Sequence, residues 1–176
     1  ERLEFFGPYI EDFSLEYLDY IAIDYYWGMA AKTMINVRKA YNWSVSPEML
    51  DDACLDLWKK YRKPILIAEN GLATKDLGKR GDGWTREAFL VHHLYYLRQA
   101  ISQGVPVMGY LHWSLTDNYE IGDYSPRFGL YSVDVRNDPA LKRVPTSAVA
   151  VYREIAGANA LPSKLVWTHM GIGRQP

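Results

Sequence analysis

Three apolar runs along the chain have the character of β-strands, and segments with the periodicity of helices lie between them. The runs span Tyr20 to Tyr26, Ile65 to Ala68 and Val105 to Trp113. The second run is apolar without alternation, which is typical of a parallel strand buried on both faces. Alternation of such strands with helices predicts βα units and a parallel sheet.

Helical patterns fill the intervals between these runs and follow the last of them. The first predicted helix begins at Ser46, a capping residue followed by proline at the first helical position. The second begins at Thr85 and is closed by Gly104, just before the last strand. The third begins near Thr146 and ends at Gly157. Each strand is therefore expected to be followed by a helix.

The remaining segments are predicted to be loops and a tail. The loop after the last strand contains Phe128 to Asp134, whose alternation suits a short β excursion, and the tail from Leu161 to Pro176 suggests a docking or oligomer-contacting extension. Three βα units cannot close a barrel of eight strands, which takes about 250 residues. An open sheet of three such strands would leave two pairing edges exposed. Residues 1–176 are therefore expected to form a single incomplete domain.

Composition narrows the range of partners. The net charge of -1 argues against nucleic acid or an anionic membrane surface as the main partner. No apolar stretch approaches the roughly 18 residues that span a bilayer. Fourteen Tyr and six Trp suit a site that stacks on flat apolar ligand faces, such as those of sugar rings. The single cysteine, Cys54, lies in a helical apolar pattern and is expected in the core.

One carboxylate lies where a barrel enzyme keeps its catalytic groups. Glu69 follows the apolar run in P-I-L-I-A-E-N-G, and Asn70-Gly71 is a strong turn signal immediately after it. In a (β/α)8 barrel the active site is built at the carboxyl ends of the strands, so Glu69 is a candidate catalytic residue. The alternative is that Glu69 merely caps the turn.

Two other strand ends carry polar or aromatic residues at nearly equal distances from Glu69. Asp24 lies 45 residues before Glu69, and Trp113 lies 44 residues after it. Because one helix fits each interval, the three strand ends are expected on the same rim. The segment W-S-L-T-D-N-Y-E then adds Asp117 and Glu120, which beside aromatic residues suit a polyhydroxylated ligand. The alternative is a buried strand followed by an ordinary polar loop.

Taken together, these motifs resemble the C-terminal part of the glycoside hydrolase family 1 β-glycosidases, especially the archaeal enzymes that act on glucosides and galactosides. The resemblance covers Tyr20 to Ile155 and includes D-Y-Y, A-E-N-G, L-H-W-S-L-T-D-N-Y-E and R-F-G-L-Y-S-V-D-V in the family's order. It implies that the three strands are the sixth to eighth of a TIM (β/α)8 barrel. It also implies retaining hydrolysis of β-linked glycosides or oligosaccharides through a covalent glycosyl-enzyme intermediate, with no cofactor and a cytoplasmic location.

The resemblance also implies roles for single residues. Glu69 resembles the nucleophile, and Tyr26 resembles the tyrosine whose hydroxyl orients it. Trp113 resembles the platform under the glycone ring. Glu120 resembles the carboxylate that binds two neighbouring sugar hydroxyls, and a carboxylate there argues for unphosphorylated sugars. The other substrate-binding candidates are Asp24, Ile121 and Phe128.

The family's acid/base glutamate lies in an N-E-P motif on an earlier strand, and N-E-P does not occur in this sequence. The mechanism therefore requires a partner, the N-terminal half of the same barrel, and a homo-oligomer is a further candidate assembly. Two other hypotheses remain open. The first is that the chain is a catalytically silent sugar-binding or scaffolding relative. The second is that it belongs to a family member that keeps the nucleophile but lacks the acid, as thioglucoside-cleaving enzymes do.

Two positions depart from the family pattern. Asp24 stands where the family usually has asparagine, and a second carboxylate near Glu69 is expected to disfavour ionisation of one of the pair. Ile121 stands where the family usually has tryptophan, which predicts weaker or broader glycone recognition. Asp123 and Arg127 are expected to shape the aglycone side or to pair with each other.

The histidines are expected to be structural. His92 and His93 are adjacent on a predicted helix and therefore lack the i, i+4 spacing of a helical metal pair, so no metal site is expected there. His112 is expected to pack near the site as a strand residue.

Overall fold

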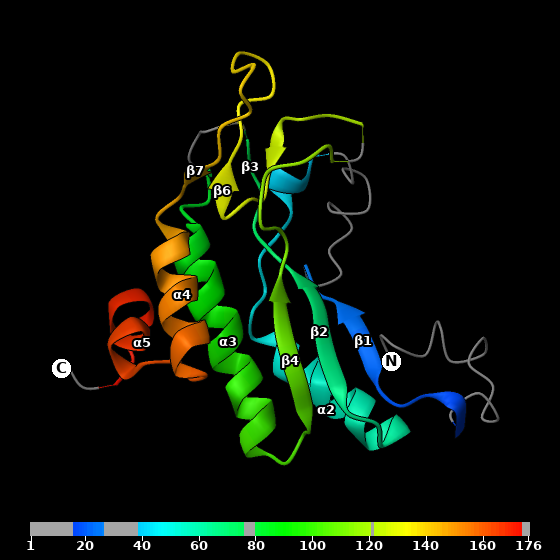
Figure 1. Cartoon of the computed structure of the whole chain (residues 1–176). Helices are drawn as coiled ribbons and strands as arrows, with labels where there is room; N and C mark the ends of the chain where they lie inside the picture. The colour runs from blue at the N-terminus through cyan, green and yellow to red at the C-terminus, as the bar shows by residue number, and fades with distance from the viewer. Residues whose placement is uncertain (1–15, 27–38, 76–79, 121, 174–176) are drawn as a thin grey trace.

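The computed structural model describes residues 16–26, 39–75, 80–120 and 122–173. Its centre is a three-stranded parallel sheet in the order β1-β2-β4, formed by Ile21–Asp24, Ile65–Asn70 and Val107–His112 (Figure 1). The predicted strands and their parallel arrangement are confirmed. The first and third strands are shorter than the apolar runs, whereas β2 extends two residues further and includes Glu69.

Four α-helices accompany this sheet within the described residues. The helix α2 connects β1 to β2, α3 connects β2 to β4, and α4 and α5 follow β4 along the chain (Figure 1). Their bounds are Met49–Tyr61 for α2, Arg86–Ser102 for α3, Ala148–Ala158 for α4 and Ser163–Met170 for α5, and a short 3-10 helix, η3, spans Ala40–Asn42.

The signals at the ends of α3 are confirmed by its geometry. The Thr85 hydroxyl accepts a hydrogen bond from the Ala88 amide at 3.2 Å, which satisfies one of the free donors at the helix start. At the other end, Gly104 has φ +90°, a left-handed conformation that glycine adopts without steric cost. Side-chain and backbone chemistry thus fix both ends of this helix.

Two other helix boundaries were predicted wrongly. The helix α2 has Glu48 as its N-cap, and the Ser46 carbonyl instead accepts from the Met49 amide at 3.3 Å in the turn that precedes the helix. The helix α4 continues through Gly157 to Ala158, and its C-cap is Asn159, which has φ 44°. Asparagine tolerates the left-handed conformation, so it replaces glycine as the residue that ends the helix.

The main core lies between the sheet and the two helices that cover one of its faces. Ile65 and Ile67 of β2 are fully buried there, and Cys54 of α2 lies in the same cluster, as predicted. Burial raises the pKa of the Cys54 thiol to about 12, so the thiol stays neutral. The other members of this cluster are Leu50, Leu57, Leu97, Ala100 and Val105.

The opposite face of the sheet is open within the described residues. Ala22 and Asp24 of β1 are exposed, and Leu111 of β4 is 53% exposed. For β2, the strand expected to be buried on both faces, Leu66 and Ala68 are half-buried on this side, because α2 and α3 both pack against the other face. An apolar sheet face left open in this way is suited to further packing.

Short antiparallel pairs lie beyond the carboxyl ends of the strands (Figure 1). The strand β3, Thr74–Lys75, pairs with β5, Pro126–Arg127, and β6, Tyr131–Ser132, pairs with β7, Val144–Pro145. The strand β6 confirms part of the β excursion predicted at residues 128–134. The β3–β5 pair ties the loop after β4 to the loop after β2, and the β6–β7 pair closes the segment between β4 and α4.

The C-terminal tail packs on its own chain. Leu165 and Val166 of α5 are buried against Val91 of α3. Two residues of the tail's apolar run thus pack within the chain, and the predicted docking or oligomer contact of the tail stays a prediction. No helix among the described residues combines the length and apolarity needed to cross a membrane.

Candidate active site

The carboxyl ends of the three parallel strands meet at one edge of the sheet. Asp24 of β1 pairs with Glu69 of β2, and Asn70 pairs with His112 of β4. Just beyond β4, the Trp113 amide donates to the Asn70 carbonyl at 3.0 Å. The prediction that the three strand ends share one rim is confirmed, and the residues that they carry are neighbours.

Glu69 and Tyr26 are joined by a short hydrogen bond. The Tyr26 hydroxyl donates to Oε2 of Glu69 at 2.6 Å. Burial, this hydrogen bond and the surrounding carboxylates raise the pKa of Tyr26, so the hydroxyl remains a donor across the physiological range. The pair therefore has the geometry expected of a carboxylate held in one orientation by a neutral donor.

An aromatic wall supports the Tyr26 ring. Trp43 and Phe128 contact it edge-on, with ring centroids 5.6 Å and 5.9 Å away. Phe128, a predicted substrate-binding residue, is 3% exposed and packs among Trp43, Ala40 and Ala73. Trp43 was not predicted to belong to the site. The residues around Trp43 in the sequence do not predict this contact, because it forms only when the chain folds.

Trp113 and Glu120 form a second pair. The Trp113 indole Nε1 donates to Oε1 of Glu120 at 2.8 Å. Burial raises the pKa of Glu120, hydrogen bonds from Trp113 and Asn118 oppose that rise, and the charge of Glu69 adds to it. The charges of Glu120 and Glu69 therefore interact within one site. A carboxylate beside an aromatic ring suits a ligand that combines hydroxyl groups with an apolar face.

A buried ion pair anchors the loop that carries Glu120. Asp117 accepts from the Gly129 amide at 2.9 Å, from the Val133 amide at 3.2 Å and from Nη1 of Arg127 at 3.2 Å. The side chains of Asp117 and Arg127 are 2% and 7% exposed. Because a buried carboxylate needs several partners, this clamp fixes the loop between Trp113 and Glu120 against the segment that contains β5 and β6.

Two glycines allow the loops to approach closely. A Cβ on Gly71 would lie 1.8 Å from the Trp113 carbonyl oxygen, and one on Gly129 would lie 2.4 Å from the Asp117 amide nitrogen. Any side chain at either position would push the loops apart. Gly71 thus brings the turn after Glu69 into contact with Trp113, where the peptide bond to Ser114 is cis.

Of the two alternatives for Asp123 and Arg127, pairing with each other is wrong. Arg127 pairs with Asp117, whereas Asp123 accepts from Nη2 of Arg136 at 3.1 Å. Val133 bonds both partners, because its carbonyl accepts from Arg127 and its amide donates to Asp117. The Asp123–Arg136 pair lies at the surface, where such pairs contribute little to stability.

Of two other predicted site residues, Asp24 and Ile121, the structure describes only Asp24. Asp24 is exposed on the open face of the sheet and is the direct register partner of Glu69. Ile121 lies outside the described residues. The two residues at which the sequence departs from the family pattern thus flank Glu69 and Glu120 in the chain or in the sheet.

His93 is fully buried, and His112 is half-buried with both ring nitrogens buried. Burial lowers the pKa of His112 to about 4 and that of His93 to about 3, so both imidazoles are neutral at neutral pH. His112 packs near the site as predicted, with its ring 6.0 Å from that of Tyr152. In the part of the chain that the structure describes, no group of three or more His, Cys, Asp or Glu side chains is arranged to hold a metal ion.

A parallel βα sheet with carboxylates and aromatic residues at the carboxyl ends of its strands is typical of α/β-barrel proteins, which build their sites at that end. The chain belongs to glycosyl hydrolase family 1, whose profile matches residues 19–161. The solved β-glycosidase from Pyrococcus horikoshii is 32% identical, with a TM-score of 0.71 over 89% of this chain and 38% of that one. Such neighbours are TIM barrels, and this chain matches a portion of them.

Archaeal β-galactosidases are among its relatives. The enzyme from Sulfolobus acidocaldarius is 39% identical over 126 residues, which are 71% of this chain and 24% of the relative. The enzyme from Saccharolobus solfataricus is 38% identical over the same shares. The chain therefore spans about a quarter of the length of these relatives.

Proposed function

We propose that this chain is the C-terminal portion, strands six to eight, of a TIM-barrel glycosidase that hydrolyses β-D-glucosides and β-D-galactosides with retention of configuration. The observation that carries the proposal is the hydrogen bond of 2.6 Å between the Tyr26 hydroxyl and Oε2 of Glu69, next to the Trp113–Glu120 pair. Archaeal β-galactosidases and a β-glycosidase among the similar proteins support the substrate class.

In the first step, a carboxylate oxygen of Glu69 attacks the anomeric carbon of the bound glycoside. The bond from that carbon to the aglycone oxygen breaks, and a second carboxylic acid donates its proton to the departing oxygen. Retaining enzymes place the two carboxyl groups about 5.5 Å apart, so the acid must come close to Glu69. The product of this step is a glycosyl ester of Glu69.

In the second step, water attacks the anomeric carbon and releases Glu69. The same second carboxylate, now ionised, takes the proton from the water as the ester bond breaks. Tyr26 keeps its proton throughout because its pKa is raised, and its hydrogen bond restricts rotation of the Glu69 carboxylate. Fixing a nucleophile in this way reduces the entropy lost on reaching the transition state.

Glu120 and Trp113 bind the glycone. A carboxylate accepts hydrogen bonds from two neighbouring hydroxyls, and the flat indole offers an apolar surface to one face of the sugar ring. Glu120 and Glu69 make the site negatively charged, so the site would repel the phosphate group of a phosphorylated sugar. The site therefore selects unphosphorylated sugars.

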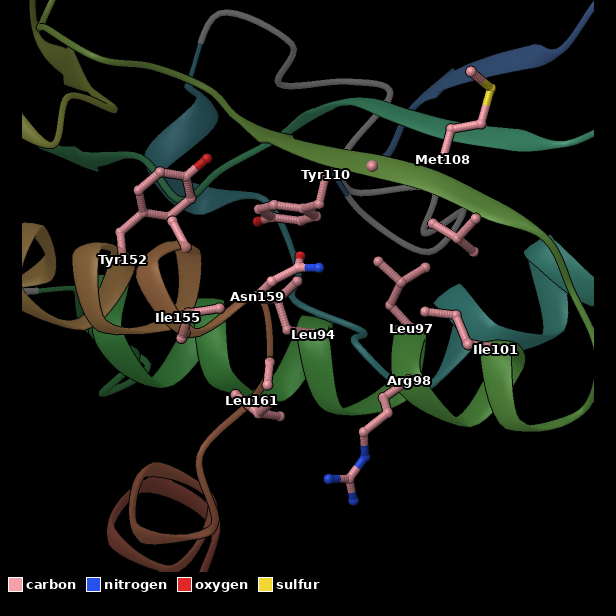
Figure 2. Close-up of a pocket in the computed structure, with 14 residues that line it drawn as sticks. Leu94, Leu97, Arg98, Ile101, Met108, Tyr110, Tyr152, Ile155, Asn159 and Leu161 are labelled. Carbon is pink, nitrogen blue, oxygen red and sulfur yellow. The ribbon is translucent and has the colours of Figure 1, made fainter.

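The acid/base group comes from the rest of the barrel, which packs on the open face and free edges of the sheet. Met108 and Leu111 of β4 are 59% and 53% exposed there. Beside β4, a cavity of about 720 Å³ opens between β4, α3 and α4 and is lined by apolar side chains such as Leu94, Leu97 and Ile155 (Figure 2). The N-terminal half of the barrel would bury these surfaces.

The second candidate function is that of a catalytically silent sugar-binding relative. The observation that favours it is the pairing of Asp24 with Glu69, which adds a carboxylate beside the nucleophile. Sugar binding through Trp113 and Glu120 would survive in such a protein, whereas the glycosyl ester of Glu69 would not form. The two functions therefore differ in a covalent product.

The experiment is covalent trapping with an activated 2-deoxy-2-fluoro-β-glucoside and the corresponding galactoside. The full-length protein is incubated with each reagent, digested and analysed by mass spectrometry. The expected result is a fluoroglycosyl adduct on the peptide that contains Glu69. The matched control is Glu69→Gln, which keeps the size of the side chain and should give no adduct.

The outcomes separate the candidates. An adduct on Glu69 together with hydrolysis of nitrophenyl glycosides supports the retaining glycosidase. Sugar binding by calorimetry without any adduct or turnover would overturn it in favour of the silent relative. If the adduct forms and the protein cleaves thioglucosides but not ordinary glucosides, it is a family member that lacks the acid.

A further inference from the structure

The side chain of Asn70, next to Glu69, connects all three strands at the level of the site. Its Oδ1 accepts from the Tyr110 hydroxyl of β4 at 2.6 Å, and its Nδ2 donates to the Tyr25 carbonyl just beyond β1. Asn70 is fully buried. Both ends of one amide are therefore satisfied by groups from the two neighbouring strands, which is the arrangement that a buried amide requires.

This connection lies where β2 bulges. Between the pairs Ile67–Tyr110 and Asn70–His112, β2 advances three residues while β4 advances two. The strand β1 shows the same mismatch, because Ile23 pairs with Ile67 but Asp24 pairs with Glu69. One extra residue in β2 relative to both neighbours is a β-bulge, a device that re-aims a side chain near an active site.

The bulge changes which way Glu69 points. In a regular strand, side chains alternate between the two faces, and Ile65 and Ile67 face the helices. A regular continuation would therefore direct residue 69 into the core. The extra residue breaks that alternation, so that the Glu69 carboxylate reaches the Tyr26 hydroxyl instead. Backbone hydrogen bonds from the Tyr25 amide to the Glu69 carbonyl at 2.8 Å and from the Trp113 amide to the Asn70 carbonyl at 3.0 Å resume after the bulge, and the Asn70 side chain adds to them.

We propose that Asn70 and Tyr110 are positioning residues that lock the β2 bulge and thereby set the orientation of Glu69 relative to Tyr26. The proposal rests on the proposed function, because it assigns the pair a role in that reaction. The link runs from the Tyr110 hydroxyl through the Asn70 amide to the Tyr25 carbonyl, and Tyr26 is the next residue. Both residues therefore act through Glu69 and Tyr26.

Tyr110 is suited to this task because its hydroxyl remains a donor. Its side chain packs between the core under β2 and the cluster that contains Leu90 and Leu130. Burial and the neighbouring Tyr152 raise the pKa of Tyr110 well above the usual value. Figure 2 shows Tyr110 pointing from β4 toward α4, on the helix side of the sheet and away from the open face.

The test uses Tyr110→Phe in the full-length protein, which removes one hydroxyl and keeps the packed ring. The expected result is a fall in kcat of about tenfold to a hundredfold with KM within about threefold of wild type, as expected when a nucleophile is slightly misplaced. The rate of labelling of Glu69 by the fluoroglycoside should fall by the same factor. The matched control is Tyr152→Phe, a tyrosine in the same cavity that is not part of the link, with rates near wild type.

A double-mutant cycle adds a second variant. Asn70→Asp keeps an acceptor for Tyr110 but loses the donor to the Tyr25 carbonyl, so it should lower kcat more than Tyr110→Phe. Because the two side chains act in one link, the double variant should be no slower than Asn70→Asp alone. Fully additive losses in kcat would show that the two residues act independently and would overturn the proposal.

A crystal structure of Tyr110→Phe provides a readout that does not depend on turnover. The proposal predicts that the Tyr26 hydroxyl and Oε2 of Glu69 move beyond hydrogen-bonding distance, from the present 2.6 Å. An unchanged distance, or labelling at the wild-type rate, would overturn it. If wild type itself is neither labelled nor active, the proposed function fails, and the crystal structure still decides whether the pair sets the orientation of Glu69.

Discussion

Glu69 and Glu120 reach the same site from two different kinds of structure. Glu69 lies on a parallel strand, where the Tyr26 hydroxyl and the bulge beside Asn70 hold it. Glu120 lies on a loop after β4, and that loop is anchored by the buried carboxylate of Asp117. The strand side of the site is therefore held by the sheet, and the loop side is held by an ion pair.

This difference matches the two tasks that we propose. A nucleophile must be placed to a fraction of an ångström, and rigid elements supply such placement better than loops do. Recognition of different sugars needs a surface that tolerates change, which loops provide. Substitutions on the strand side should therefore lower kcat, whereas substitutions on the loop side should mainly raise KM.

The largest effect is expected from Glu69→Gln on the strand side. A neutral amide is a poor nucleophile, so kcat for β-glucosides and β-galactosides should fall at least about a thousandfold, with sugar binding retained. The measurements are steady-state kinetics with nitrophenyl glycosides and calorimetric titration with a sugar. Retention of a tenth of the wild-type kcat would exclude Glu69 as the nucleophile.

The next largest effect is expected from Asp117→Asn on the loop side. The change leaves the Arg127 guanidinium buried without a charged partner, and breaking a buried pair costs about 3–5 kcal/mol. We expect the free energy of unfolding to fall by about 3 kcal/mol and KM to rise more than kcat falls. Denaturant unfolding and steady-state kinetics check both expectations.

Arg136→Gln is the matched control for this clamp, because it removes the exposed ion pair with Asp123 on the same segment. Both measurements should stay near wild type in the control. If Asp117→Asn lowered kcat and left KM and stability unchanged, the distinction between a strand side and a loop side would be wrong.

Local chemistry explains why much of the fold was predictable. The three strands follow from short apolar runs, and α3 begins at Thr85 and ends before Gly104 because each residue satisfies a local backbone requirement. The end of α4 was missed because Asn159, as well as Gly157, can adopt a left-handed conformation. Sequence alone does not decide between two such residues that are close together.

The site was predictable only where its parts lie at strand ends. Equal spacing placed Asp24, Glu69 and Trp113 on one rim, but spacing carries no information about register shifts. The bulge in β2 depends on pairing with both neighbouring strands, and the contact of Trp43 with Tyr26 depends on the path of the chain between β1 and α2. Such long-range contacts leave no local pattern in the sequence.

A smaller effect with a distinct pH dependence is expected from Trp113→Phe. The indole hydrogen bond lowers the pKa of Glu120, so its loss should raise that pKa further. Since sugar hydroxyls donate best to the ionised carboxylate, binding weakens as pH falls through the pKa of Glu120. The acidic limb of kcat/KM should therefore move to higher pH, and KM at neutral pH should rise about tenfold.

The measurement is a pH profile of kcat/KM for wild type, Trp113→Phe and the control Trp84→Phe. The Trp84 ring packs against His92 on α3, so its substitution should leave the acidic limb in place. An acidic limb that stayed unchanged in Trp113→Phe would show that the indole does not stabilise the charge of Glu120 during binding.

The smallest effect is expected from Asp24→Asn, which restores the amide usual in the family. Asp24 pairs with Glu69 in the sheet, so its charge opposes that of the nucleophile, but its side chain is exposed in the described structure and solvent weakens the repulsion. We therefore expect kcat to stay level or to rise by no more than about threefold. If assembly with the rest of the barrel buries Asp24, screening decreases and the rise should be larger. A loss of kcat above tenfold would mean that the Asp24 carboxylate takes part in the reaction, and the strand side of the site would then contribute two working carboxylates.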